Sequence, residues 1–313
     1  MAGSFARRCT EGSETTCQSH VENVAGAFRH VAGSGRRTEG EGHRVGAVIP
    51  PVVDRAWLAR HPKAVLADAR YYLDGRSAAD AYAAGHLPGA VRVDMDAVLA
   101  GPPSPEAGRH PLPTPERFAA GLSAVGIGDG TIVVAYDDAG GAMAGRLVWL
   151  LRMLGEDAAL LDGSLGAWDG ELTVDVLVPT PAAFTVRPWP DDALATIDEA
   201  ATGRFVIDAR TGERYRGETE PIDPRAGHIP GAHSFPLSGN LAPDGRFLAP
   251  AQLRARFAAV DDAAAVISYC GSGITACHNL IALEHAGLGR GRLYSGSWSQ
   301  YSNTDRPAAV GEE

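Results

Sequence analysis

The stretch Val266–Leu280, "VISYCGSGITACHNL", decides how the chain folds. A run of apolar and β-branched residues ends at Cys270, two glycines follow, and a helical apolar pattern begins near Ile274. The first run predicts a buried strand and the second a helix, so the cysteine lies in the turn between them. Strands that alternate with helices predict a mainly parallel sheet with helices on both faces. Such sheets bind ligands at the carboxyl ends of their strands, where Cys270 is expected.

The chain repeats itself once. Four segments recur in the same order: "VLADAR" at 65–70 as "FVIDAR" at 205–210, "AGHLPGAVRV" at 84–93 as "AGHIPGAHSF" at 226–235, "TIVVAYDD" at 131–138 as "AAVISYCG" at 264–271, and "LLDGSLGAW" at 160–168 as "LYSGSWSQY" at 293–301. A single recurrence of this length predicts a duplicated domain rather than a solenoid. We expect a disordered tail over 1–44, domains over 45–170 and 184–310, and a proline-containing linker over 171–183.

Composition excludes several classes of protein. The net charge of −10 argues against a general surface for nucleic acid or anionic membrane. No apolar run is long enough to span a membrane, and the first residues lack the apolar core of a secretory signal. Of the four cysteines, two lie in the polar tail and two near the glycine turn, which is no disulfide framework, so a cytoplasmic location is expected.

The turn after Cys270 has the features of an anion cradle. Gly271 and Gly273 let successive backbone N–H groups turn toward the sulfur, and the following helix points its positive end there. A thiolate is an anion, so the cradle favours a nucleophilic cysteine over one that only packs in the core. The matching position in the first repeat is Asp137, where a carboxylate that caps the next helix is expected.

Other chemistries fit the turn less well. A cysteine phosphatase needs an arginine six positions after its nucleophile, and that position is Ala276. A zinc site could combine Cys270, Cys277 and His278, but no second pair of ligands has suitable spacing, so no metal is expected. Cys277 and His278 are more typical of packing residues on a helix. A redox pair of Cys270 with Cys277 is a further option.

The segments "CGSGITA" at 270–276, "GHIPGA" at 227–232 and "GSWSQY" at 296–301 together resemble the two-domain sulfurtransferases of the rhodanese family. The resemblance implies two tandem rhodanese-like domains, with the active site in the second domain and facing the first. Family members that use thiosulfate typically carry basic residues just after the cysteine. The neutral loop here is similar to that of the members that use 3-mercaptopyruvate.

The resemblance implies an enzyme that moves sulfur from 3-mercaptopyruvate through a persulfide on Cys270 to a thiol or cyanide, releasing pyruvate. It implies no cofactor. The expected partners are a small-molecule sulfur donor and a thiol acceptor, with thioredoxin as one candidate, and neither nucleic acid nor membrane. Two alternatives stay open: a thiosulfate sulfurtransferase, and a persulfide carrier or sensor that hands sulfur to a protein partner without turnover.

The resemblance also assigns substrate-binding residues. Arg214 in "DARTGERYRGE" matches the family's first substrate arginine, and a forked guanidinium suits a carboxylate. Arg225 is the nearest candidate for the second arginine, and Arg216 is the alternative. The loop around the substrate would consist of Gly271, Gly273, Ile274 and Thr275.

A Ser–His–Asp relay is a further expectation from the resemblance. Ser272 matches the serine, and His110 in "GRHPLPTPERF" looks like the histidine. The aspartate would fall near positions 98–100, where the chain has none, so Asp94 or Asp96 would have to replace it. The cysteine chemistry is expected whether or not this relay operates.

Three pairs of polar residues occur in both repeats, including the repeat without the thiol. They are Asp68 and Asp208, Arg70 and Arg210, and His86 and His228. Because they recur where no cysteine can react, we expect them to satisfy backbone groups of loops.

Overall fold

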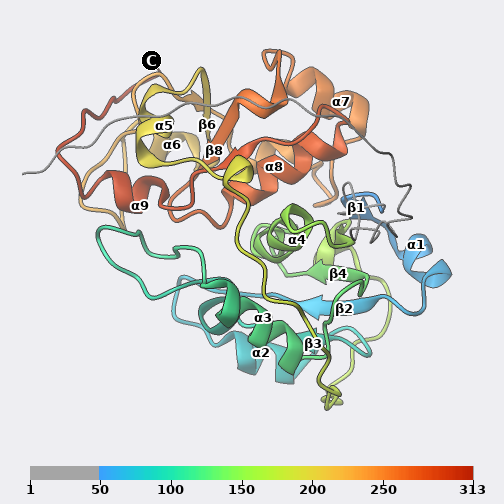
Figure 1. The fold of residues 1–313 in the computed structure, drawn as a ribbon. Coiled ribbons are helices and arrows are strands. Elements are labelled where there is room, and N and C mark those ends of the chain that lie inside the picture. The colour runs from blue at the N-terminus through green and yellow to red at the C-terminus, as the bar shows by residue number, and fades with distance from the viewer. Residues whose placement is uncertain (1–48, 313) are drawn as a thin grey trace, which may run out of the picture. The chain divides into compact units, whose positions relative to one another are not determined.

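A computed structural model describes residues 49–312, which contain two parallel sheets with their helices (Figure 1). The tail expected over 1–44 lies outside the described residues. Within them, no helix combines the length and the apolar character needed to cross a membrane.

The first repeat forms a five-stranded sheet in the order β1-β5-β4-β2-β3, with all neighbouring strands parallel. Its elements are β1 (Val52–Val53), α1 (Arg55–Arg60), β2 (Val65–Asp68), α2 (Ala78–Ala84), β3 (Val91–Arg92), the π-helical turn η1 (Met95–Leu99), α3 (Pro115–Ala124), β4 (Val133–Tyr136), α4 (Ala144–Met153), β5 (Ala158–Leu161) and the 3₁₀ turn η2 (Ser164–Ala167). Figure 1 shows α4 on one face of this sheet and α2 and α3 on the other.

The second repeat forms a four-stranded parallel sheet in the order β7-β6-β8-β9. Its elements are η3 (Asp191–Ala193), α5 (Ile197–Thr202), β6 (Phe205–Asp208), α6 (Gly212–Tyr215), β7 (His233–Ser234), η4 (Leu237–Asn240), α7 (Pro250–Arg256), η5 (Ala263–Ala265), β8 (Val266–Tyr269), α8 (Ala276–His285), β9 (Arg292–Leu293) and α9 (Ser297–Tyr301). This order corresponds to the order β3-β2-β4-β5 of the first sheet. The pairing of β1 with β5 in the first sheet has its counterpart in an isolated parallel bridge between Leu194 and Leu293. The predicted duplication and fold class are confirmed.

The strand–turn–helix unit of the opening stretch is present in both repeats. The strands β4 and β8 are buried along their whole length, which explains why their sequences are largely apolar without alternation. The helices α4 and α8 follow them, as predicted. Gly155 and Gly287, just beyond these helices, have φ of 82° and 74°, the left-handed conformation in which helices commonly end.

Two serines fix the ends of β4 and β8 in the same way. Ser164 and Ser297 are the only non-glycine residues between 49 and 312 with positive φ, at 51° and 52°. Their hydroxyls accept hydrogen bonds from the backbone N–H of Asp137 (3.5 Å) and of Cys270 (3.1 Å). Such backbone strain persists only where the surroundings determine it, so each serine fixes the residue that follows the strand.

In the first repeat, backbone N–H groups of the turn after β4 donate hydrogen bonds to a carboxylate. Asp137 is fully buried, and its Oδ1 accepts the N–H groups of Ala139 and Gly141, both at 2.8 Å. Its Oδ2 accepts the N–H groups of Met143 and Ala144 at 2.7 and 2.9 Å. Ala144 is the first residue of α4, so the predicted capping role of Asp137 is confirmed.

The two repeats pack against each other through α4 and α8. Arg152 of α4 forms a partly buried ion pair with Glu284 of α8 at 2.6 Å. Beyond the helices, the backbone N–H of Phe247 donates to Asp162 Oδ1 at 2.8 Å. The interface thus combines helix packing with polar contacts.

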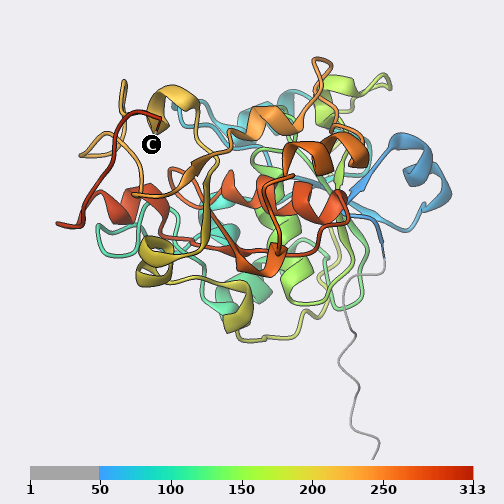
Figure 2. The same cartoon turned by 90° about the horizontal axis from the view of Figure 1, so that it is seen from above.

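The segment 171–190, yellow-green in Figures 1 and 2, connects the repeats without a helix or strand. Its last part lies on the first repeat. Phe184 stacks edge-on against Phe118 with ring centroids 5.7 Å apart, and Trp189 Nε1 donates to the carbonyl of Pro113 at 2.8 Å. Residues just after the expected linker therefore contact the first repeat before the second repeat begins at η3.

We expect Asp137→Ala to lower the free energy of unfolding by about 3 kcal/mol, because four backbone N–H groups, of which those of Gly141 and Ala144 are buried, lose their acceptor. Sulfur transfer per folded molecule should persist, since Asp137 does not line the cavity at Cys270. Urea unfolding measures the effect, with Asp138→Ala as the matched control at an exposed neighbour. Equal losses in the two variants would contradict the structural role of Asp137.

Candidate active site

Cys270 follows β8 and lies in a turn that only glycine can complete. The cysteine is 1% exposed, and the backbone N–H of Gly273 donates to its Sγ at 3.1 Å. Gly273 has φ of 79°, and a Cβ there would lie 2.4 Å from the carbonyl oxygen of Ser295. The helix α8 begins at Ala276, so its positive end lies close to the sulfur. A backbone N–H group and the N-terminal end of a helix are thus both directed at this sulfur.

The first repeat shows which kind of group this turn holds. There, four N–H groups converge on the Asp137 carboxylate, and the Cys270 sulfur takes the equivalent position in the second repeat. The turn thus directs four backbone N–H groups at the side chain of Asp137 in the first copy and one, that of Gly273, at the sulfur in the second. In the second copy, the group in the turn is the candidate nucleophile.

A cavity of ≈ 360 Å³ opens at Cys270, a size typical of small-molecule sites. Both repeats line it. The first repeat contributes Tyr71, Leu73, Arg109 and Met143, and the second contributes, among others, Arg210, Arg214, Cys270, Gly271, Ser272, Ile274 and Thr275. Most of the residues expected at the site therefore share one cavity between the repeats.

His110 connects the two repeats at Ser272. Its Nδ1 lies 2.8 Å from Ser272 Oγ, and its Nε2 lies 3.1 Å from the Tyr71 hydroxyl and 4.0 Å from Asp96 Oδ1. Of the two candidate aspartates, Asp96 is the one near His110, whereas Asp94 caps η1. The serine and histidine of the expected relay are in contact, and a tyrosine that was not anticipated lies on the far side of the ring.

His110 is held in its neutral form. Burial, with smaller contributions from the positive charges of Arg109 and Arg146, lowers the pKa of His110 to about 4. The ring is therefore uncharged at neutral pH, with one nitrogen able to donate and the other able to accept a hydrogen bond.

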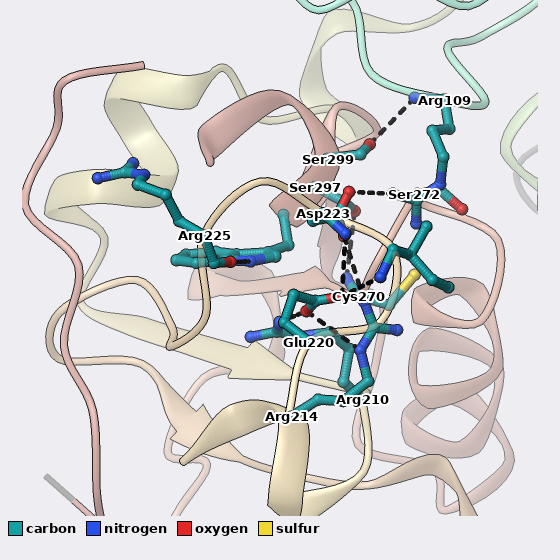
Figure 3. Close-up of polar contacts among 12 residues, drawn as sticks. Arg109, Arg210, Arg214, Glu220, Asp223, Arg225, Cys270, Ser272, Ser297 and Ser299 are labelled. Atoms are coloured by element: carbon teal, nitrogen blue, oxygen red, sulfur yellow. Dashed lines mark hydrogen bonds and ion pairs between the residues drawn. The ribbon is translucent and has the colours of Figure 1, made fainter. Parts of the chain in front are cut away.

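Two arginines from different repeats meet at the loop (Figure 3). Arg214 pairs with Glu220 at 2.6 Å and with Asp223 at 3.2 Å. Arg109 pairs with the other oxygen of Asp223. A Cβ at Gly271 would lie 3.1 Å from Arg109 Nη2 and 3.3 Å from Arg214 Nη1. Both guanidinium groups thus approach the loop that carries Cys270.

The position of Arg225 corrects the expectation that it binds substrate. Its three guanidinium nitrogens donate to the carbonyls of Ser302, Arg306 and Tyr301 at 2.9 to 3.1 Å. Figure 3 shows its guanidinium pointing away from Cys270, and Arg225 does not line the cavity. Its role is to hold the segment after α9.

Arg216 also lies outside the cavity, where it pairs with Glu218 at 2.7 Å. Arg109, like Tyr71, lines the cavity but was not predicted from the sequence. The only sequence feature that could have marked it as a residue of the site is its position beside His110 in "GRHPLPTPERF".

The neighbours of Cys270 on α8 are packing residues. Burial raises the pKa of Cys277 to about 12, and its Sγ lies 3.4 Å from the carbonyl oxygen of Gly273. His278 stacks on Phe247 and contacts Asn240 at 3.1 Å. Between residues 49 and 312, no group of three or more His, Cys, Asp or Glu side chains could hold a metal ion. Cys277 is thus a protonated thiol at neutral pH, which leaves Cys270 as the nucleophile candidate.

The duplicated polar pairs have the structural roles expected of them. Arg70 pairs with Asp68 at 2.6 Å and Arg210 with Asp208 at 2.7 Å. Each arginine also donates to the carbonyl of the glycine that precedes the duplicated histidine, at 2.9 Å in the first repeat and 2.6 Å in the second. The histidines bond to backbone carbonyls in turn.

The chain resembles several known proteins. It is 43% identical to a probable 3-mercaptopyruvate sulfurtransferase of Pseudomonas aeruginosa over 272 residues, 80% of this chain and 94% of the relative. It is 37% identical to a putative thiosulfate sulfurtransferase, SseB, of Mycobacterium tuberculosis over 81% of this chain and 93% of the relative. The solved 3-mercaptopyruvate sulfurtransferase from Leishmania major superposes with a TM-score of 0.73 at 31% identity, covering 82% of this chain and 75% of that chain.

The rhodanese-like domain family matches residues 54–171 and 190–304. These two segments contain nearly all of the two sheets, and only the second carries the cysteine in its turn. The chain therefore belongs to the rhodanese family, as a sulfurtransferase with two rhodanese-like domains.

Proposed function

We propose that the protein transfers sulfur from 3-mercaptopyruvate, through a persulfide on Cys270, to a thiol or cyanide acceptor. The observation that carries the proposal is the pairing of a neutral loop, Gly271 to Gly273, with an arginine set to one side of it. Arg214 Nη1 faces the loop without belonging to it, so it suits an anion whose charge lies away from the reacting sulfur.

The first half of the reaction forms the persulfide. The Cys270 thiolate attacks the donor sulfur, a sulfur–sulfur bond forms and the carbon–sulfur bond breaks. The electrons of the broken bond pass to the three-carbon fragment as an enolate, which takes a proton and leaves as pyruvate. The N–H of Gly273 and the positive end of α8 stabilise the sulfur anion before the attack and the persulfide after it.

Ser272 and His110 supply the proton in this proposal. The Ser272 hydroxyl lines the cavity and contacts His110, whose other nitrogen contacts the Tyr71 hydroxyl. A neutral ring can take a proton at one nitrogen as it releases one from the other. The chain of contacts thus delivers a solvent proton to the enolate through Ser272.

The second half of the reaction restores the thiolate. An acceptor thiolate attacks the outer sulfur, the sulfur–sulfur bond breaks and Cys270 leaves as the thiolate. We include thioredoxin as a protein acceptor and the cytoplasm as the location. Both proposals rest on the free, buried thiols of Cys270 and Cys277, which suit a reducing compartment.

One observation favours thiosulfate as a second candidate donor. Arg109 and Arg214 both approach Gly271, so positive charge lies closer to the loop than the loop sequence alone suggests. A small dianion would benefit from this charge, and the relative from M. tuberculosis is named a putative thiosulfate sulfurtransferase.

Cys270→Ser should reduce sulfur transfer by several orders of magnitude while the protein stays folded, because a hydroxyl is a far weaker nucleophile at neutral pH. Mass spectrometry after one turnover should locate the persulfide on Cys270 in the native enzyme. Cys277→Ser is the matched control and should retain transfer. A persulfide found on Cys277 would refute the assignment.

The donor is tested by comparing kcat/KM for 3-mercaptopyruvate and thiosulfate. We expect 3-mercaptopyruvate to be favoured about tenfold or more, since its carboxylate reaches an arginine while its sulfur meets a neutral loop. A higher kcat/KM for thiosulfate would replace the proposed donor with the second candidate. Persulfide formation without steady-state turnover of either donor would instead indicate a carrier.

The pH profile tests the neutral relay. Because the pKa of His110 lies near 4, the ring stays uncharged at every pH above about 5. We therefore expect the single-turnover rate of pyruvate release to vary with pH between 5.5 and 7.5 in the same way in the native enzyme and in the His110→Gln variant. A step near pH 6.5 that is present in the native enzyme and absent from this variant would show that His110 titrates as an ordinary histidine.

A further inference from the structure

We propose that Arg146, from the repeat without the cysteine, is a positioning residue for sulfur transfer. It holds the turn of Cys270 and the loop of His110 in the arrangement that reacts. The inference deepens the proposed function and rests on it. It is carried by two contacts that cross between the repeats in opposite directions, of which only one bears a charge.

Arg146 is a fully buried side chain of α4 that reaches three carbonyl groups outside its own helix. Its Nη1 donates to Gly273 at 2.8 Å, its Nη2 to His110 at 3.1 Å and its Nε to Leu99 at 3.4 Å. Between residues 49 and 312, no carboxylate forms an ion pair with it. Arg152, the other buried arginine of α4, does have such a partner in Glu284.

The second repeat makes the reciprocal contact with His278. Arg146 is the third residue of α4, and His278 is the third residue of α8. His278 Nε2 lies 3.2 Å from the carbonyl oxygen of Gly140. Gly140 follows Asp137 by three residues, just as Gly273 follows Cys270. Each repeat thus extends a side chain from the same helix position to the same carbonyl in the turn of the other repeat.

The two contacts differ in charge. Burial lowers the pKa of His278 to about 4, so its ring is neutral. Burial also lowers the pKa of Arg146, and the neighbouring sulfurs of Cys277 and Cys270 act in the opposite direction. A guanidinium nevertheless stays protonated in proteins. A buried charge without a carboxylate partner is costly, and a neutral ring makes the equivalent contact in the first repeat. The charge beside Cys270 therefore indicates a role beyond holding a turn in place.

Gly273 shows how this contact acts on the sulfur. Its N–H donates to Cys270 Sγ at 3.1 Å, and its carbonyl accepts from Arg146. Glycine has the most backbone freedom of all residues, so a Gly273 without this anchor can turn its N–H away from the sulfur. The same planar guanidinium holds the carbonyl of His110, whose ring contacts Ser272. One rigid fork thus fixes the cysteine turn and the histidine relative to each other.

The test separates the rate of reaction from binding of the donor. For Arg146→Gln we expect kcat with 3-mercaptopyruvate, and the single-turnover rate of persulfide formation, to fall about 100-fold. KM should change less than threefold, because a small misplacement of the reacting groups lowers the rate rather than the affinity. Arg146→Lys should lose about tenfold in kcat, since an ammonium group keeps the charge without the fork. A native kcat in Arg146→Lys would overturn the inference, even if Arg146→Gln does not fold.

His278→Gln is the matched control, because it is the same substitution at the reciprocal contact. It should lower kcat less than threefold. Equal losses of kcat in Arg146→Gln and His278→Gln would overturn the inference and leave both residues as links between the repeats. A loss in Arg146→Gln that appears only in KM would overturn it as well.

Hydrogen exchange gives a measurement that does not depend on the donor. The backbone amides of residues 271–275 should exchange about tenfold faster in Arg146→Gln than in the native protein, and at the native rate in His278→Gln. Native exchange in Arg146→Gln would show that Arg146 does not hold the turn. If exchange accelerates as expected but the native enzyme forms no persulfide from 3-mercaptopyruvate, the proposed function is wrong and the positioning of the turn by Arg146 stands.

Discussion

The turn after the central strand of each repeat directs backbone N–H groups at one buried side chain, four at Asp137 and one at Cys270, and this is the constraint on which the rest of the structure depends. A buried N–H without an acceptor is destabilising, so the turn requires a partner in both repeats. Asp137 supplies its carboxyl oxygens, whereas Cys270 supplies a sulfur, which in the proposed reaction takes up and passes on a second sulfur atom. The same geometry therefore stabilises one domain and supports the chemistry of the other.

The cavity at Cys270 lies where the two repeats meet. His110 and Arg109 come from the first repeat, and the loop that they face comes from the second. The fully buried Arg146 of α4 donates to the carbonyls of Gly273 at 2.8 Å and His110 at 3.1 Å, which fixes the loop relative to the histidine. The repeat without the cysteine thus positions His110 beside Ser272 and brings the positive charge of Arg109 to the cavity.

Local patterns were enough to predict the strand–turn–helix units, the duplication and the position of Cys270, because each depends on neighbours in sequence. Which arginines lie at the cavity was harder to predict from the sequence. Arg225 precedes the family motif in sequence, but long-range hydrogen bonds to the segment after α9 turn it away, and Arg109 enters from the other repeat. The position of Asp96 near His110 likewise depends on the π-helical turn η1, which no sequence pattern indicated.

The burial of Cys270 has a consequence for the choice of acceptor. At 1% exposure, the sulfur gives an incoming thiol almost no open surface on which to land. Small nucleophiles can enter the cavity, but a protein must present its cysteine on a protruding tip rather than on a flat face. In the proposed reaction, the burial of the thiol therefore selects acceptors by their reach.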